Sequence, residues 1–343
     1  MVPALVLALV VAQSPAAARE DATSRYEQGA AVGQDAAVAV AEARKLIAAD
    51  KPRDAIAKLQ GIPDPSPEVR YLLGVAYYHA DDYPHAIEQL SAIRTSLPEG
   101  SFERREATQV LGLSLYVSKR YPDAIPLLEE TRAWASDNLE LGYILGQAYI
   151  QMRQPERARE ALARTFGLAP ESAAAHVVAA QLMLRMEMEP LAEVELKQAV
   201  EKDPKIPRAH YLLGQLALFR GKLDEAIGLS EKELTLNPSD AMAFHQLGDA
   251  YLRASKADEA IAALQKSVWL NPYYSAPYIL LGRLYMTKDQ PATAEGMLRQ
   301  AIQYDPNNRS AHYLLGQLLQ RVGRTEEAKK EFAIAESLQP PGR

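Results

Sequence analysis

A repeat of fixed length constrains this chain more than any other feature of its sequence. From Pro170 to Pro204 is 34 residues, and the same step relates prolines, alanines and glycines over six copies. The columns of related positions are Pro170, Pro204, Pro238, Pro272, Pro306 and Pro340; Ala158, Ala192, Ala226, Ala260, Ala294 and Ala328; and Gly146, Gly214, Gly248, Gly282 and Gly316, with Ala180 as the one substitution. Such a period is typical of stacked units, none of which can bury its apolar side alone.

One copy of the repeat, residues 241–272, shows what the unit is. Residues 241–255 and residues 258–270 each carry apolar side chains at helical spacing on one stripe. A short polar turn separates them, and we expect Asp258 to cap the second helix. Asn271-Pro272 ends that helix, because the residue before proline avoids the α region and proline lacks an N–H. The unit is therefore predicted to be a helix–turn–helix.

The landmark residues Leu247-Gly248, Tyr251, Ala260 and Pro272 at this period resemble the tetratricopeptide repeat family. The resemblance covers nearly the whole chain beyond residue 36. It implies an all-α, right-handed superhelical solenoid of about nine stacked repeats, with a concave inner face lined by the first helix of each repeat. We expect Gly248 and Ala260 to lie where paired helices approach closely, so that a larger side chain there would cost roughly 1–3 kcal/mol.

The N-terminal repeats keep the landmarks less strictly. The first repeat is degenerate, with helices expected over residues 35–50 and 52–60. From Gly74 to Gly112 is 38 residues, so four extra residues are expected near Pro98, and Ser101 is expected to cap the helix that follows. The strict period then runs from about residue 105 to residue 340.

Residues 1–18 have the features of a signal peptide. They carry no charged side chain, and an apolar run precedes a small-residue cleavage site before Arg19. No Lys or Arg lies near Met1, so an apolar first helix of the fold is the alternative. The division is thus a signal peptide at 1–18, a linker or frayed helix at 19–35, and a solenoid at 36–340. It predicts export to a bacterial periplasm or to the extracellular space.

A further column lies eight residues after the landmark alanines. We expect its apolar members to receive the next repeat and its last member, which is charged, to face solvent at the end of the array. The column reads Phe166, Val200, Leu234, Val268, Ile302 and Glu336, while the earlier positions hold Arg94 and Arg132.

Composition and motifs exclude several classes of function. A net charge of −6 argues against a nucleic-acid binder, and the absence of cysteine excludes disulfides, thiolate metal sites and a cysteine nucleophile. Neither a phosphate-binding glycine loop nor a nucleophile elbow occurs. His176, His210 and His312 share one column, which favours packing over metal binding. We therefore predict no catalytic, cofactor-binding or metal-binding residues; an enzyme built on helical repeats would need a convergent titratable cluster, and we find none.

The family's inner face supplies the candidate site. Its columns, read from the resemblance, contain glutamines that can bond a peptide backbone, tyrosines that offer area with a polar tip, and arginines that can clamp carboxylates. The predicted groove residues are Tyr143, Gln147, Gln181, Arg185, Tyr211, Gln215, His245, Asp249, Arg253, Arg283, Tyr313, Gln317 and Arg321.

These residues predict a protein or peptide partner, with acidic side chains or a free C-terminus. Family members that clamp chaperone C-termini use Lys and Asn in these columns, which this chain lacks, so it does not resemble such a clamp. The function expected is a non-enzymatic scaffold or adaptor in envelope assembly, secretion or polysaccharide export, by analogy only. The alternative is an anchoring or regulatory subunit of an envelope enzyme, with its signal left uncleaved.

Overall fold

The computed structural model describes residues 34–136 and 138–338. Over these residues the chain is all-α, with 18 α-helices and no strand. The predicted signal peptide and nearly all of the predicted linker lie outside the described residues. The chain divides into two compact units, one ending at Pro170 and the other beginning at Glu171, and each is described by itself.

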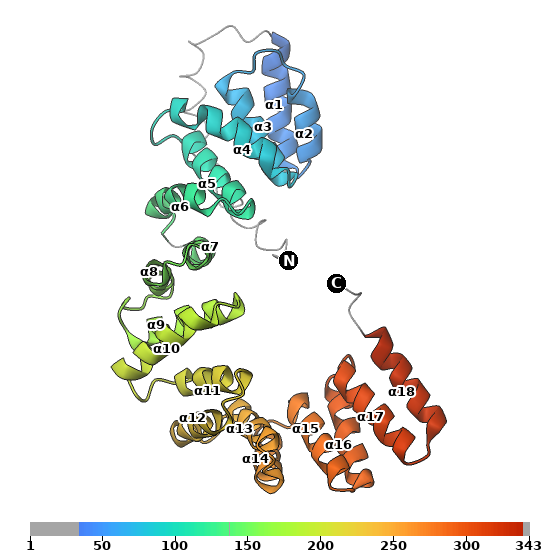
Figure 1. The fold of residues 1–343 in the computed structure, drawn as a ribbon. Coiled ribbons are helices and arrows are strands. Elements are labelled where there is room, and N and C mark those ends of the chain that lie inside the picture. The colour runs from blue at the N-terminus through green and yellow to red at the C-terminus, as the bar shows by residue number, and fades with distance from the viewer. Residues whose placement is uncertain (1–33, 137, 339–343) are drawn as a thin grey trace. The chain divides into compact units, whose positions relative to one another are not determined.

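The first unit contains four helix pairs and one short 3₁₀ turn (Figure 1). Its elements are α1 (Gln34–Ala48), α2 (Pro52–Leu59), α3 (Pro67–His79), α4 (Tyr83–Ile93), η3 (Arg94–Ser96), α5 (Phe102–Val117), α6 (Tyr121–Trp134), α7 (Leu139–Gln151) and α8 (Pro155–Thr165).

The second unit contains five helix pairs. Its elements are α9 (Ala173–Arg185), α10 (Glu189–Lys202), α11 (Ala209–Phe219), α12 (Leu223–Leu236), α13 (Ala241–Arg253), α14 (Ala257–Leu270), α15 (Ser275–Thr287), α16 (Pro291–Tyr304), α17 (Arg309–Arg321) and α18 (Thr325–Ser337). The predictions of an all-α chain and of about nine helix–turn–helix repeats are confirmed.

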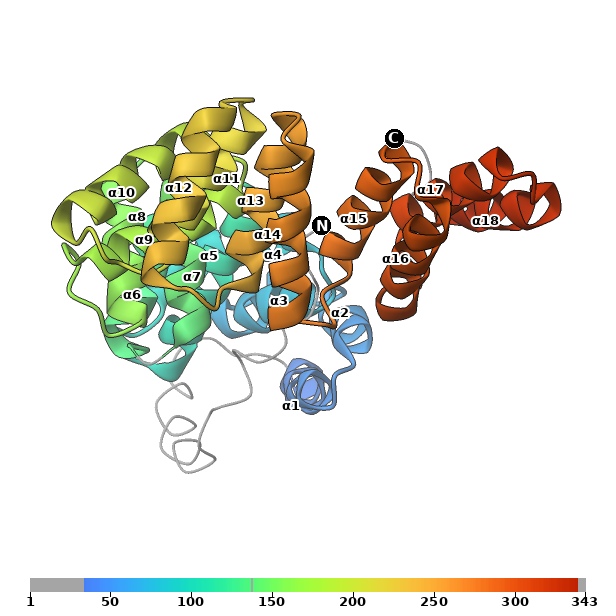
Figure 2. The same cartoon turned by 90° about the horizontal axis from the view of Figure 1, so that it is seen from below.

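Within each unit, each helix packs against its partner in the pair, and each second helix packs against the first helix of the next pair, as Figures 1 and 2 show from two sides. First helices also contact the first helices of neighbouring pairs, as in α3 with α5 and in α11, α13, α15 and α17. Second helices are further apart and reach one another mainly through the first helix between them. The first helices of a unit therefore form its inner face and the second helices its outer face.

The landmark glycines lie where paired helices are in contact, as the sequence predicts. A Cβ atom on Gly248 would lie 2.5 Å from Cγ of Leu264 and 3.3 Å from the carbonyl oxygen of Ala260. Leu264 and Ala260 are fully buried. The small residue lets the backbone of the first helix rest directly on the leucine of the second.

The landmark tyrosines link successive pairs on the side away from the inner face. The hydroxyl of Tyr251 donates to Glu231, 20 residues earlier on the preceding second helix, at 2.8 Å. Tyr149 donates to Glu129 in the same register at 2.6 Å. At Tyr149 and Tyr251 the tyrosine of this column therefore ties its first helix to the pair before it.

The turn between the helices of a pair is a Schellman motif. In the α13–α14 turn, Ser255 has a positive φ of 60°, and the N–H of Lys256 donates to the carbonyl oxygen of Tyr251 at 2.9 Å. This geometry corrects one prediction. The N-cap of α14 is Lys256 and makes no side-chain cap bond, so Asp258 lies inside the first turn and is too late to cap it.

The longer step between the second and third repeats is accommodated as expected. The 3₁₀ turn η3 and a loop hold the additional residues, with Leu97 buried beneath them. Ser101 is the N-cap of α5 and accepts the N–H of Arg104 at 3.1 Å, as predicted.

The apolar column after the landmark alanines contains one exception to its predicted role. Phe166 is 53 % exposed, whereas Val200, Leu234, Val268 and Ile302 are at least partly buried. The reason is the length of the helix. Helix α8 ends at Thr165 after 11 residues, while its counterpart α10 runs for 14, so Phe166 lies in the turn and not on the packed side of a helix. Glu336 is exposed, as expected for the last position of the column.

The α11–α12 pair differs from the others in the side chain that packs against its landmark glycine. Where other pairs place a leucine or phenylalanine against the landmark glycine, α12 has Ser230 opposite Gly214. The amide of Gln246, from the following pair, occupies this space. Gln246 Nε2 donates to Ser230 Oγ at 3.1 Å and to the carbonyl oxygen of Tyr211 at 3.2 Å, and its side chain is 4 % exposed. A polar bridge between neighbouring pairs thus replaces an apolar contact within one pair.

Candidate peptide-binding face

The predicted groove residues fall into two sets because they lie in two units. Tyr143 and Gln147 are on α7 of the first unit, and the remaining eleven are on first helices of the second unit. We call the exposed surface of α9, α11, α13, α15 and α17 the inner face. It is defined by Arg185, Gln215, Phe219, Arg253, Arg283, Tyr313, Gln317 and Arg321, all of which are exposed.

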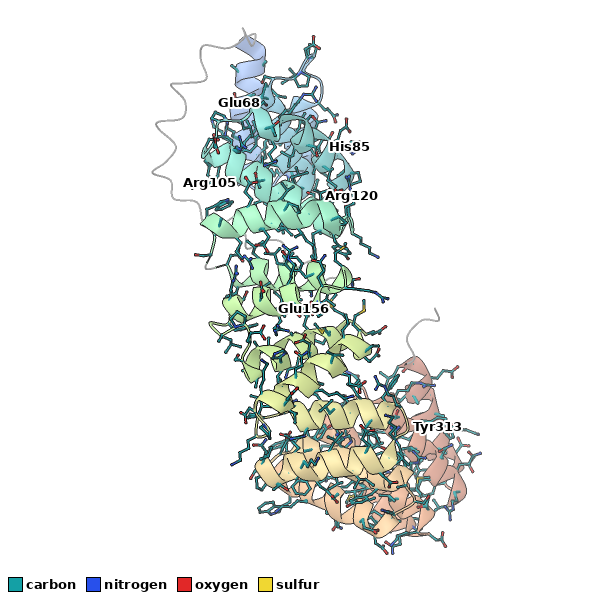
Figure 3. The ribbon with its side chains drawn as sticks, turned by 60° about the vertical axis from the view of Figure 1, so that its left-hand side comes forward. Glu68, His85, Arg105, Arg120, Glu156 and Tyr313 are labelled. Atoms are coloured by element: carbon teal, nitrogen blue, oxygen red, sulfur yellow. The ribbon has the colours of Figure 1, made fainter. Side chains whose placement is uncertain are left out.

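Helical periodicity explains why these residues share one surface. Each lies on a first helix whose other side carries the landmark glycine, or its alanine substitute, packed against the second helix. The position after that landmark turns outward, which exposes Gln215, Arg283 and Gln317. Tyr313 on α17 is 47 % exposed (Figure 3).

Two of the three arginines predicted on α13, α15 and α17 are already engaged within the protein. Arg253 forms two hydrogen bonds to Asp249, of 3.1 and 2.9 Å, one turn earlier on its own helix. Arg321 donates to the carbonyl oxygen of Met286 at 2.9 Å and pairs with Asp289 at 2.6 Å, at the end of α15. Their charges are therefore largely balanced on this face.

Arg283 on α15 differs from these two. It is exposed, and among the described residues no hydrogen bond or ion pair involves it. Its guanidinium can accept a bidentate carboxylate without breaking an existing pair.

Two predicted aromatic residues are packing residues. Tyr211 is 8 % exposed, and the guanidinium of Arg208 lies 5.1 Å from the centre of its ring. His245 lies edge-on to the ring of Tyr274, and burial lowers its pKa, so that the imidazole is neutral near pH 7. Neither offers a free ring to a ligand.

Phe219, at the end of α11, is the residue that the prediction left out. It is 78 % exposed, the highest value among the large hydrophobic side chains described. It lies in the column of Arg185, Arg253 and Arg321, which is otherwise polar. An apolar residue in a polar column is the sequence signal that could have identified it.

The remaining predicted residues lie closer to their own helices. Gln181 and Asp249 are half-buried, and Asp249 is held by Arg253. In the first unit, Gln147 accepts a hydrogen bond from the Tyr116 hydroxyl of the preceding pair, and Tyr143 is half-buried. Gln147 thus connects two pairs.

The histidine column packs as predicted, and two of its three members share a hydrogen-bonding role. His210 and His312 each place Nε2 near the carbonyl oxygen of the proline six residues earlier, at 3.1 and 3.0 Å. Tyr278 donates its hydroxyl to Pro272 in the same way at 2.9 Å. These side chains satisfy the carbonyl that ends the preceding repeat.

The described residues hold no group of three or more His, Asp or Glu side chains placed to bind a metal ion. None of their helices is both long enough and apolar enough to cross a membrane.

Solved structures similar to this chain are helical-repeat proteins of low sequence identity. PilF of Pseudomonas aeruginosa is 23 % identical, with 60 % of this chain and 93 % of that chain covered and a TM-score of 0.49. MamA of Desulfovibrio magneticus is 24 % identical, with 48 % and 94 % covered and a TM-score of 0.44. A thermophilic TPR protein of Thermus thermophilus is 19 % identical, with 49 % and 92 % covered and a TM-score of 0.43.

A search of curated proteins found no match. Family models give a clearer result. Three models, all described as tetratricopeptide repeat, match residues 116–182 and 285–340, residues 191–241, and residues 242–274. These segments lie along the array of helix pairs from α5 to α18. The chain belongs to the tetratricopeptide repeat family.

Proposed function

We propose that the protein is a non-enzymatic scaffold that binds an extended segment of a partner protein along the inner face. The observation that carries the proposal is the exposure of Phe219, Arg283 and Tyr313 on α11, α15 and α17. Large apolar and unpaired cationic side chains on one solvent-facing surface are typical of a recognition surface. Gln215 and Gln317 add amides that can bond a peptide backbone.

The balance of charge on this face refines the expected partner. Arg253 and Arg321 are paired within the protein, so a run of acidic residues would have to displace existing partners. Arg283 can bind one carboxylate directly. We therefore propose a segment that presents a single carboxylate, from an acidic side chain or a free C-terminus, together with an apolar side chain for Phe219.

A comparison of three baits tests this proposal. The wild-type protein, the Phe219→Ala/Arg283→Glu variant and the Trp269→Ala variant are used to capture partners from an extract of the native cell. Trp269 is 70 % exposed on α14, a second helix, so its removal controls for the loss of an exposed aromatic ring. We expect a partner that the wild type and Trp269→Ala capture equally and that the double variant loses. Equal capture by all three baits would contradict the assignment of the inner face.

We also propose that the protein acts after export, in the periplasm or at the cell surface, in envelope assembly, secretion or polysaccharide export. The support is the sequence of residues 1–18 alone. Mass spectrometry of the protein purified from its own cells tests this step. An N-terminus near Arg19 supports release, whereas an intact Met1 favours an anchored subunit of a membrane complex.

A further inference from the structure

A crevice opens on the outer face of the first unit, between the second helices α6 and α8. Its volume is about 340 Å³, within the range of small-molecule sites. It exists because second helices are further apart than first helices, so that α6 and α8 reach each other mainly through α7. Glu156, at the start of α8, marks this helix in Figure 3.

Tyr149 on α7 forms the floor of the crevice. Its side chain is 1 % exposed, and its hydroxyl donates to Glu129 of α6 at 2.6 Å. Burial and the neighbouring Glu129 carboxylate raise the pKa of Tyr149, so the phenol stays protonated and keeps this bond. The floor is therefore fixed and the wall on the α6 side is held to it.

Three arginines line the crevice, one from α6 and two from α8. Arg132 uses one guanidinium nitrogen to bond Glu129, while its Nη1 is buried without an acceptor among the described residues. The guanidinium of Arg157 lies over the ring of Tyr149, 4.5 Å from its centre. Arg164 is exposed and makes no ion pair with a described residue. Donors from two helices thus converge on one space.

Of the three arginines, Arg132 is paired with a carboxylate of the crevice, whereas Arg157 and Arg164 form no ion pair with a described residue. Glu129 already accepts from both Tyr149 and Arg132. Glu160 is exposed and forms no ion pair with either Arg157 or Arg164. Once the Arg132–Glu129 pair is set aside, Arg157, Arg164 and Glu160 are the charged side chains left in the crevice. They give it a local excess of positive charge on a protein whose net charge is −6.

The corresponding position between the second helices α12 and α14 lacks the three arginines, so the repeat architecture does not require them. Their counterparts there are Leu234, Glu259 and Lys266. Tyr251 and Glu231 there keep the hydrogen bond of the floor. The hydrogen bond belongs to the fold, whereas the three arginines are specific to the crevice between α6 and α8.

We propose that this crevice is a binding site for an oxyanion, a carboxylate or a phosphoryl group, held by Arg157 and Arg164 above the ring of Tyr149. Guanidinium groups bind both kinds of oxyanion through paired N–H donors. A cavity of about 340 Å³ admits a small molecule that carries such a group, or one charged side chain of a partner. The site lies in the other unit from the inner face and does not depend on the function proposed for that face.

Calorimetric titration of the full chain with inorganic phosphate and, separately, with succinate tests the proposal at constant ionic strength. We expect saturable binding of at least one of them to the wild type. The Arg157→Gln/Arg164→Gln variant should bind that anion at least about tenfold more weakly, since a hydrogen bond to a charged group contributes about that factor or more. Both side chains are solvent-facing, and helical circular dichroism confirms that the variant is folded.

The Lys232→Gln/Lys266→Gln variant is the matched control, because it removes the same number of positive charges from the exposed surface of the second helices α12 and α14. It should bind as the wild type does. Binding of phosphate alone assigns a phosphoryl site, and binding of succinate alone assigns a carboxylate site. The proposal is overturned if neither anion binds, or if the control variant loses as much affinity as the crevice variant.

Discussion

Two glycines of one helix pair allow a measurement of how much stability depends on the close approach of a first helix to its second helix. Gly282 on α15 faces α16, and a Cβ atom there would lie 2.6 Å from Cγ and 2.7 Å from Cδ2 of Leu298, which is fully buried. Gly296 lies within α16, and a Cβ atom on it would meet nothing within 4 Å. Substitution by alanine therefore adds the same methyl group to a closed contact and to open space.

The two substitutions should act in opposite directions. Replacing a helical glycine by alanine contributes about 0.5–1 kcal/mol of stability through the backbone, and Gly296→Ala should show that gain. In Gly282→Ala the same gain is offset by overpacking against Leu298 Cγ, at about 1–3 kcal/mol. Because the backbone contribution cancels in the comparison, Gly282→Ala should be less stable than Gly296→Ala by about 1–3 kcal/mol.

Urea unfolding followed by helical circular dichroism measures both variants against the wild type. Thermal unfolding should separate them in the same order, by about 2–4 °C for each kcal/mol in a folded unit of this size. The reasoning is refuted if Gly282→Ala is as stable as Gly296→Ala. That result would mean that α15 and α16 move apart at little cost, and the glycine column would not be a packing requirement.

Two further predictions concern single contacts. Ser101→Ala removes the cap of α5, leaves the N–H of Arg104 without its acceptor, and should lower the free energy of unfolding by about 1 kcal/mol, measured by urea denaturation. In the second unit, hydrogen bonds from Lys197 and Arg220 lower the pKa of Glu193 from 4.5 to about 2. The folded pKa is depressed, so this stabilisation is present above pH 4.5 and is lost as the pH falls toward 2. The stability difference between the wild type and Glu193→Gln should therefore shrink across this window, and a difference that does not change with pH would contradict the pairing.

The period carried most of the information about the fold. Gly248 and Ala260 identify the contact between paired helices because only small residues allow it, so the packing followed from the sequence. The errors came from features that the period does not encode. Asp258 fails to cap because the turn before it is a Schellman motif, and Phe166 is exposed because α8 is shorter than α10.

The sequence predicted which surface carries the candidate site, but it did not predict which arginines on that surface are free of ion pairs. A column of the repeat places Arg253 and Arg321 on first helices, another places Arg283, and all three are exposed. Whether a guanidinium is free depends on carboxylates in other parts of the repeat, such as Asp289 at the end of α15. A single column of the repeat does not show which carboxylate lies beside which arginine. Arg132 was visible as a break in an apolar column, but its convergence with residues of α8 needed coordinates.

Ser230 and Gln246 have a consequence for how the chain tolerates rearrangement. A helix pair whose landmark glycine packs against a leucine of the same pair is a self-contained module. Such modules can be exchanged, duplicated or deleted in steps of 34 residues with little change in their interiors. The module that contains Ser230 cannot, because the group that fills its interior belongs to the next module. Deleting residues 241–274 would bring Leu280 into the place of Gln246 and leave Ser230 Oγ and the carbonyl oxygen of Tyr211 without their shared donor. The order of these two modules is therefore fixed by chemistry as well as by the repeat itself.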